Sequence, residues 1–285
     1  MLPVHIIVLL AAIQGLSEAL PVSRSGHDAV AWLWLEPGRN GPQLETFLHF
    51  ATASALIFAA RRRLSDAGRA GLLALTRPGL FRSSAAAYDA AIVLGALGTS
   101  MVSSSLVDLV ARYWMTTPVA VGFGLLLTGL LLATTALADA TRSEAMLQDK
   151  PSMFFALLLG FGQGMSSLPG GSFLGVTLVM ASWMRMKNDF ALDLALLLSA
   201  MGLYTKSLHA MFQGPILPDI PGAALAVAFF TAFLGTTVAL RATRFVLEKR
   251  ALALTACWTV PLGLAILAYS RAFSESLAIA TTRPG

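Results

Sequence analysis

Long apolar stretches recur along the chain and constrain its fold more than any other feature. They cover residues 47–60, 87–107, 118–138, 191–212, 222–242 and 251–270. A helix needs about 20 apolar residues to cross the hydrocarbon core of a bilayer. The 285 residues are 56% hydrophobic and 12% charged, with a mean hydropathy of +0.72, which excludes an ordinary soluble domain. We therefore predict an all-α polytopic integral membrane protein.

Basic residues are concentrated in two short loops beside apolar stretches. Residues 61–85 carry six arginines against one aspartate, and residues 241–250 carry four basic residues against one glutamate. The positive-inside rule places both loops on the cytoplasmic side. The stretches 36–45 and 213–221 are acidic on balance and fit the opposite side. The distribution of basic residues behind the net charge of +5 is thus typical of an oriented membrane protein. We expect membrane lipids but no nucleic acid as partners.

A polar run from Gln14 to His27 interrupts the apolar N-terminal region. It holds one carboxylate, three hydroxyls, one guanidinium and one imidazole. An ionisable group at membrane depth costs at least a few kcal/mol, so Glu18, Arg24 and His27 indicate a functional site. Two structural interpretations stay open: Glu18 and Arg24 could form a buried ion pair, and His27 could be a buried histidine whose hydrogen bonds are satisfied.

The polar run has an echo in the second half of the chain. Residues 14–21 read QGLSEALP and residues 163–169 read QGMSSLP; VSRSG follows the first proline and GGSFLG the second. Three crossings follow each copy, and because three is odd the second half is inverted. We predict one membrane domain with inverted repeats at 1–139 and 152–272 and a C-terminal tail at 273–285. Each repeat has a re-entrant helical hairpin, broken at Pro21 or Pro169, and three crossings.

The two breaks indicate a polar cavity, because non-helical backbone inside a membrane is tolerated only where it is buried in protein or lines a wet cavity. Inverted repeats with broken helices place their binding site where the breaks meet. Hydroxyls and backbone N–H groups at helix N-termini bind phosphate well. The residues expected to bind phosphate in this way are Ser23, Ser25, Gly26, Gly170, Gly171, Ser172 and Gly175, with Gln14, Ser17 and Gln163 in support.

Three ionisable residues of the polar run are predicted to be catalytic. Arg24 can grip phosphoryl oxygens through two parallel hydrogen bonds. His27 can accept or supply a proton near neutral pH. Glu18 can hold a divalent metal, orient a water or fix His27. These residue types match phosphoryl transfer or hydrolysis.

The polar run resembles the first motif of the bacitracin-resistance type of undecaprenyl-diphosphatase, an integral membrane phosphatase. The resemblance also covers residues 48–52, 61–64, 117–119, 128–130 and 163–175. It implies hydrolysis of undecaprenyl diphosphate to the monophosphate, which recycles the lipid carrier of cell-wall synthesis. It also implies a divalent cation, Mg²⁺ or Ca²⁺, and a bacterial inner membrane protein with its active site facing the periplasm. A homodimer is a further expectation.

The sequence departs from the family pattern at two positions. Arg24 stands where the family usually has a serine, a proposed nucleophile. Phe173 stands where its second motif usually has an arginine that grips the diphosphate. If the two hairpin tips meet, Arg24 could replace the guanidinium lost at Phe173. The nucleophile would then be an activated water or His27.

Paired broken helices also occur in transporters. A polyprenyl-phosphate binding protein or flippase without hydrolysis is therefore the alternative function. An ion or proton carrier that uses Glu18 and His27 fits the hydroxyl- and glycine-rich surroundings less well. Other polar residues are weaker signals: packing or a hydrogen bond to a neighbouring helix is expected at His49, Asp28 is expected to face away from His27, and Lys206 is expected to snorkel.

Overall fold

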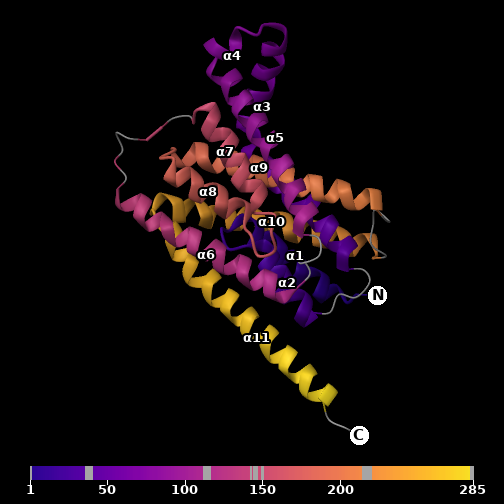
Figure 1. Cartoon of the computed structure of the whole chain (residues 1–285). Helices are drawn as coiled ribbons and strands as arrows, with labels where there is room; N and C mark the ends of the chain where they lie inside the picture. The colour runs from indigo at the N-terminus through magenta and orange to yellow at the C-terminus, as the bar shows by residue number, and fades with distance from the viewer. Residues whose placement is uncertain are drawn as a thin grey trace.

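The computed structural model describes residues 2–35, 41–111, 117–141, 143, 147–148, 151–213 and 220–282. The described residues form helices and no strand (Figure 1), so the predicted all-α class is confirmed. Residues 36–40 and 214–219, which belong to the predicted acidic loops, lie outside the described residues. So do residues 283–285 of the predicted tail; the rest of that tail continues the last helix.

The helices fall into two series of similar order. The first series is α1 (Val4–Ala19), α2 (Arg24–Leu35), α3 (Gly41–Thr76), the short α4 (Leu80–Ser83), α5 (Ala85–Ala111) and α6 (Pro118–Ala140). The second series is α7 (Met153–Met165), α8 (Phe173–Trp183), α9 (Asn188–Gln213), α10 (Gly222–Glu248), a 3₁₀ turn (Leu252–Thr255) and α11 (Ala256–Thr282). In each series two short helices precede three long ones.

Five of the described helical segments are long and apolar enough to cross a bilayer: Ala85–Val110, Pro118–Ala140, Asn188–Leu208, Gly222–Glu248 and Leu252–Ala272. They correspond to five of the six predicted crossings, and the protein is a multi-pass membrane protein. The sixth predicted crossing, 47–60, lies within α3 and is not among the five. Glu45 and His49 interrupt the apolar part of α3, and the arginines that begin at Arg61 end this apolar part before the helix itself ends.

Both predicted helix breaks are present. The residue before a proline disfavours helical backbone, and α1 ends at Ala19 with Leu20 extended before Pro21. The second break runs from Ser166 to Ser172 and contains Pro169. The flanking helices α1, α7 and α8 have 16, 13 and 11 residues, fewer than a crossing needs.

The broken helices pack on the opposite half of the chain. Helix α1 packs on α10, and α7 packs in the same way on α5. A Cβ on Gly15 would collide with the backbone of Ala232, and one on Gly164 with the backbone of Ser100, so both contacts need glycine. Helix α3 packs against α9, and α6 against α11 (Figure 1). This exchanged pairing is what a pseudo-two-fold axis produces, and it supports the inverted repeat, which stays a prediction.

Helix α9 passes through the centre of the main apolar core. Its Leu194, Leu196 and Leu198 are almost fully buried among side chains from α3, α5 and α8. Burying a leucine side chain contributes about 1.5–3 kcal/mol. This helix therefore holds the polar residues near its two ends, Asp193 and Lys206, in fixed positions.

Candidate functional site

The two helix breaks meet in space. We call residues 20–25 the first tip and residues 166–172 the second tip. The Ser23 hydroxyl donates to the Gly171 carbonyl at 3.1 Å. The Ser25 hydroxyl accepts from the Gly170 N–H at 3.0 Å and donates to the same Gly171 carbonyl at 3.4 Å. The two copies of the echoed sequence thus form one site.

Each tip contains a serine that caps the following helix. The Ser23 hydroxyl accepts from the Gly26 N–H at 3.2 Å, and the Ser172 hydroxyl accepts from the Gly175 N–H at 3.0 Å. Such caps satisfy N–H groups that a helix start leaves free. The N-termini of α2 and α8 therefore both begin at the tips, where their dipoles favour an anion.

Left-handed backbone turns the chain at both tips. Ser23 has a φ of 68°, and Gly170 has a φ of 76°. This conformation is uncommon for a residue other than glycine. The Ser23 hydroxyl accepts from the Gly26 N–H and donates to the Gly171 carbonyl. The contact with the second tip therefore helps to fix this strained residue.

Helix α6 supports the second tip. A Cβ on Gly124 would collide with the Pro169 carbonyl, so glycine is needed there for the tip to lie against the helix. One turn further along, the Thr128 hydroxyl donates to the Gly170 carbonyl at 3.0 Å. The second tip therefore rests on α6 as well as on the first tip.

A small polar cavity lies between the tips. Its volume is about 10 Å³, which is room for about one water molecule. Among the described residues, Ser167 Oγ is buried without a hydrogen-bond partner, and the close partner of Glu18 Oε2 is Arg24 Nε at 3.0 Å. Buried polar atoms are normally satisfied, so Ser167 Oγ can take a polar ligand, and Glu18 Oε2 can take one beside the arginine. The residues that line the cavity are Glu18, Arg24, Ser25, Ser166, Ser167, Gly171, Ser172, Phe173 and Lys206.

Arg24 binds acidic groups from three helices. Its Nε lies 3.0 Å from Glu18 Oε2 on α1, and its Nη1 lies 2.6 Å from Asp28 Oδ2 on α2. On α3 the same Nη1 lies 3.2 Å from Glu45 Oε1 and donates to His49 Nε2 at 2.7 Å. The buried Glu18–Arg24 ion pair and a hydrogen bond between His49 and a neighbouring helix are both among the interpretations of the sequence, and both are present. The pairing of Arg24 with Asp28 and Glu45 is not among these interpretations.

His27 lies beside the first tip but does not line the cavity. Its Nδ1 donates to the Ser23 carbonyl at 2.7 Å, and its Nε2 accepts from the Trp258 indole N–H at 2.8 Å. The two rings are stacked with their centroids 6.1 Å apart. Both ring nitrogens are therefore engaged in holding the tip, and the catalytic role of His27 stays a prediction.

The three residues expected to support the site connect the broken helices to their surroundings. Gln14 donates to the Thr52 hydroxyl of α3 at 3.4 Å. Gln163 donates to the Leu198 carbonyl of α9 at 3.4 Å and accepts from the Ser100 hydroxyl. Ser17 donates to the Ile13 carbonyl within α1 at 2.6 Å. Corresponding glutamines of the two repeats thus contact corresponding helices.

Lys206 and Phe173 separate the polar cavity from a larger one. The Lys206 Nζ lies 4.8 Å from the centroid of the Phe173 ring. Both side chains also line a cavity of about 830 Å³ between α5 and α9, with Ser104, Asp108 and Met201 on its walls. No carboxylate of the described residues forms an ion pair with Lys206. The sequence signal for Lys206 is a lysine within an apolar stretch, for which snorkelling is the expectation.

A ready-made metal site is absent from the described residues, where no three His, Cys, Asp or Glu side chains come together. Glu18 nevertheless offers a buried carboxylate at the polar cavity, beside Arg24. Magnesium is commonly bound by one or two carboxylates together with substrate phosphates. The site therefore fits Mg²⁺ that arrives with a phosphorylated substrate better than Ca²⁺, which takes six to eight oxygen ligands.

Comparison with known proteins gives consistent matches over most of the chain. The pattern of the family described as bacitracin resistance protein BacA matches residues 7–265. A protein of Geobacter metallireducens named undecaprenyl-diphosphatase is 30% identical over 236 residues, which are 80% of this chain and 85% of that protein. A Korarchaeum cryptofilum protein of the same name is 26% identical over 263 residues, 91% and 97% of the two chains.

Proposed function

Because the chain belongs to the bacitracin resistance protein BacA family, we propose that it hydrolyses undecaprenyl diphosphate, or a similar polyprenyl diphosphate, to the monophosphate and inorganic phosphate. The names of the relatives support this reaction. The observation that carries the proposal is the polar cavity between the tips, where Ser167 Oγ is buried without a hydrogen-bond partner and the Glu18 carboxylate lies beside Arg24. A phosphate would accept a hydrogen bond from Ser167, and the attacking water would donate one to Glu18.

The proposed nucleophile is water oriented by Glu18. The water oxygen forms a bond to the terminal phosphorus while the bond to the bridging oxygen breaks, and the lipid monophosphate leaves. The water gives its proton to the Glu18 carboxylate. His27 is less suited to attack because both of its ring nitrogens are engaged. We assign it a positioning role, in which it holds the Ser23 carbonyl.

The developing negative charge is stabilised by groups of both tips. The Ser25 and Ser167 hydroxyls and the N-termini of α2 and α8 face the cavity region. Fixed dipoles of this kind stabilise a transition state strongly because they need no reorganisation. Arg24 acts mainly by positioning Glu18, since its guanidinium is shared among carboxylates.

Lys206 takes the place that sequence reasoning gave to Arg24. Its ammonium lies against the ring that replaces the family's usual arginine, and among the described residues it forms no ion pair. The polar cavity is too small for a phosphate, so Phe173 and Lys206 must move aside when the diphosphate enters from the larger cavity. That cavity mixes serine, threonine and apolar side chains and suits a lipid diphosphate.

A divalent cation, if bound, would be held by Glu18 together with phosphate oxygens, and it would neutralise charge on the leaving monophosphate. Mg²⁺ is the proposed ion. The protein residues then orient the diphosphate and exclude bulk water from the cavity.

We further propose that the site opens to the outer side of a bacterial plasma membrane. The basic residues expected in loops lie largely in the C-terminal parts of α3 and α10 and indicate the cytoplasmic side. Asp193 of α9 pairs there with Arg63 at 2.9 Å. Lys206 is thirteen residues further along α9, roughly 20 Å away at 1.5 Å per residue. The tips therefore lie toward the opposite side from the arginines.

Phosphate release from a purified polyprenyl diphosphate tests the function directly. Protein in detergent with Mg²⁺ should release inorganic phosphate, and Glu18→Gln should reduce release at least 10²-fold while the purified protein keeps its elution volume. Glu248→Gln, on the exposed end of α10, is the matched control. Wild-type protein that binds the lipid but releases no phosphate would favour the binding protein or flippase instead.

A further inference from the structure

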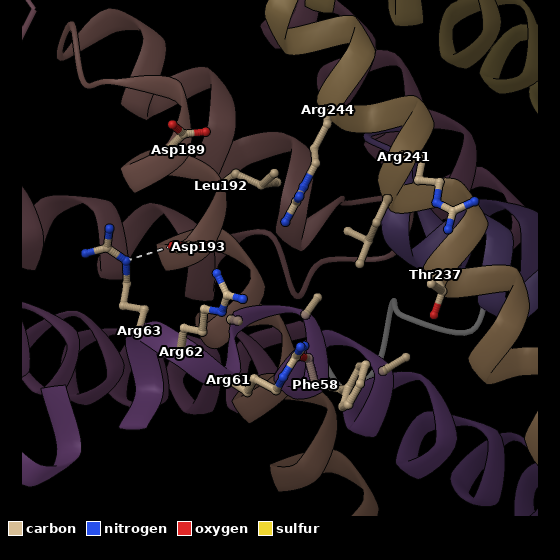
Figure 2. Close-up of a pocket in the computed structure, with 14 residues that line it drawn as sticks. Phe58, Arg61, Arg62, Arg63, Asp189, Leu192, Asp193, Thr237, Arg241 and Arg244 are labelled. Carbon is tan, nitrogen blue, oxygen red and sulfur yellow. Dashed lines mark hydrogen bonds and ion pairs between the residues drawn. The ribbon is translucent and has the colours of Figure 1, made fainter. Parts of the chain in front are cut away.

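A third cavity lies at the basic end of the molecule, between α3, α9 and α10 (Figure 2). Its volume is about 480 Å³. Five arginines and two aspartates line it, and Phe58, Leu192 and Leu240 form apolar parts of its wall. None of these residues belongs to the tips. The cavity therefore has an excess of three positive charges and needs an explanation of its own.

Two of the arginines already have partners. Arg63 pairs with Asp89 at 3.2 Å and with Asp193 at 2.9 Å. Arg61 donates to the Phe58 carbonyl at 2.7 Å and lies over the Phe58 ring at 4.2 Å. The ion pairs neutralise Arg63, and the contacts with Phe58 fix the position of Arg61.

The other three arginines, Arg62, Arg241 and Arg244, form no ion pair with any carboxylate of the described residues. Figure 2 shows Arg62 of α3 and Arg244 of α10 extending into the space between the helices. Guanidinium groups bind phosphate oxygens through paired hydrogen bonds. Three unpaired guanidinium groups around one cavity therefore favour a phosphorylated ligand.

The surroundings favour a lipid over a soluble phosphate. Phe58 lines the cavity yet is 54% exposed, and Val238, next to the lining residue Thr237, is 58% exposed. Both lie in apolar stretches of a membrane protein, so the cavity borders a surface that lipid chains contact. Basic pockets between membrane helices on the cytoplasmic side are typical binding sites for phosphorylated lipid headgroups.

We propose that this cavity binds the phosphate headgroup of an anionic phospholipid of the cytoplasmic leaflet. Arg62, Arg241 and Arg244 bind the phosphate oxygens, and Phe58 and Leu240 contact the acyl chains. The site lies roughly 20 Å from the tips, by the rise of α9, and the proposal does not depend on the hydrolysis of a diphosphate.

Native mass spectrometry of the detergent-purified protein, titrated with phosphatidylglycerol or phosphatidylcholine, tests this proposal. We expect the first phosphatidylglycerol to bind at least tenfold more tightly than phosphatidylcholine. The double variant Arg62→Gln/Arg244→Gln should lose that preference, because two of the three phosphate ligands are gone. Arg69→Gln/Arg77→Gln is the matched control, since it removes two exposed arginines of the same basic region outside the cavity and should bind like the wild type.

Three outcomes would overturn the proposal: equal binding of both lipids, an unchanged preference in the double variant, or competition by inorganic phosphate at the lipid's own concentration, which would indicate a soluble ligand. The thermal unfolding midpoint of the double variant, compared with that of the control, shows whether it is folded. Phosphate release from a polyprenyl diphosphate in detergent should stay unchanged in the double variant.

Discussion

Lys206 of α9 holds its ammonium 4.8 Å above the ring centre of Phe173, the first residue of α8. A cation thus lies at the second tip even though the residue at position 173 is aromatic. Cation–π contacts of this kind contribute about 0.5–2 kcal/mol. A contact of this strength is weak enough for the Lys206 ammonium to leave the Phe173 ring and bind a phosphate.

Replacement of Lys206 should impair turnover more than stability. We expect Lys206→Gln to lower kcat/KM about 10²-fold, because a charge that faces the phosphate is removed, and Lys206→Arg to keep part of the activity. Lys249→Gln is a close control, since Lys249 also lies over a phenylalanine ring, that of Phe245, at 5.8 Å but far from the tips. Equal kcat/KM in Lys206→Gln and wild type would exclude contact with the phosphate.

Replacement of Arg24 should destabilise the fold. Arg24→Gln leaves Glu18, Asp28 and Glu45 without their common cation, and removing one partner of a buried pair costs about 3–5 kcal/mol. The measurement is the shift of the thermal unfolding midpoint in detergent. Arg69→Gln, at an exposed position of α3, should shift it little. An unchanged midpoint with lost activity would instead indicate that Arg24 contacts the substrate.

His27 gives a sharp test of positioning against catalysis. An asparagine can still donate to the Ser23 carbonyl, so we expect His27→Asn to keep turnover within about tenfold of the wild type and to leave the pH profile of kcat/KM unchanged. General acid–base catalysis contributes 10²–10⁴-fold. A loss of that size, with a flattened pH profile, would restore His27 to the catalytic role.

The close approach of the second tip to α6 should not tolerate a side chain. Gly124→Ala places a methyl group against the Pro169 carbonyl, and overpacking costs about 1–3 kcal/mol; phosphate release should fall because the tip is displaced. Gly98→Ala in α5 is the matched control, since no atom lies within 4 Å of its added Cβ. It should be neutral or stabilising by about 0.5–1 kcal/mol, as judged by thermal unfolding.

The contact between the tips could be predicted because the motif that forms each tip occurs twice in the sequence. The echo between residues 14–21 and 163–169 and the prolines at 21 and 169 indicated two broken helices, and both breaks are present. The serine caps at Ser23 and Ser172 also follow from local sequence. Helix breaks and caps can be predicted because they depend on the backbone of a few neighbouring residues.

The partners of Arg24 on α3 could not be predicted in the same way. Glu45 and His49 are more than 20 residues away from it in the sequence, and Lys206, the other cation at the cavity, is on α9. Only helix packing brings them together, and apolar periodicity does not reveal which polar residue of a crossing faces which neighbour. Site residues also explain why the segment 47–60 is not among the five apolar spans, because polar residues such as His49 lower its mean hydropathy and contact the site.

The packing of α1 on α10 also bears on the order in which the protein is made. Helix α1 leaves the ribosome before α10, but the surface that covers its Gly15 face belongs to residues 222–248. The contact of the strained Ser23 with Gly171 likewise forms only after the second tip is made. Helix α1 therefore lacks its final neighbour until about 200 residues later in synthesis, and the candidate site cannot close before the second half of the chain is made.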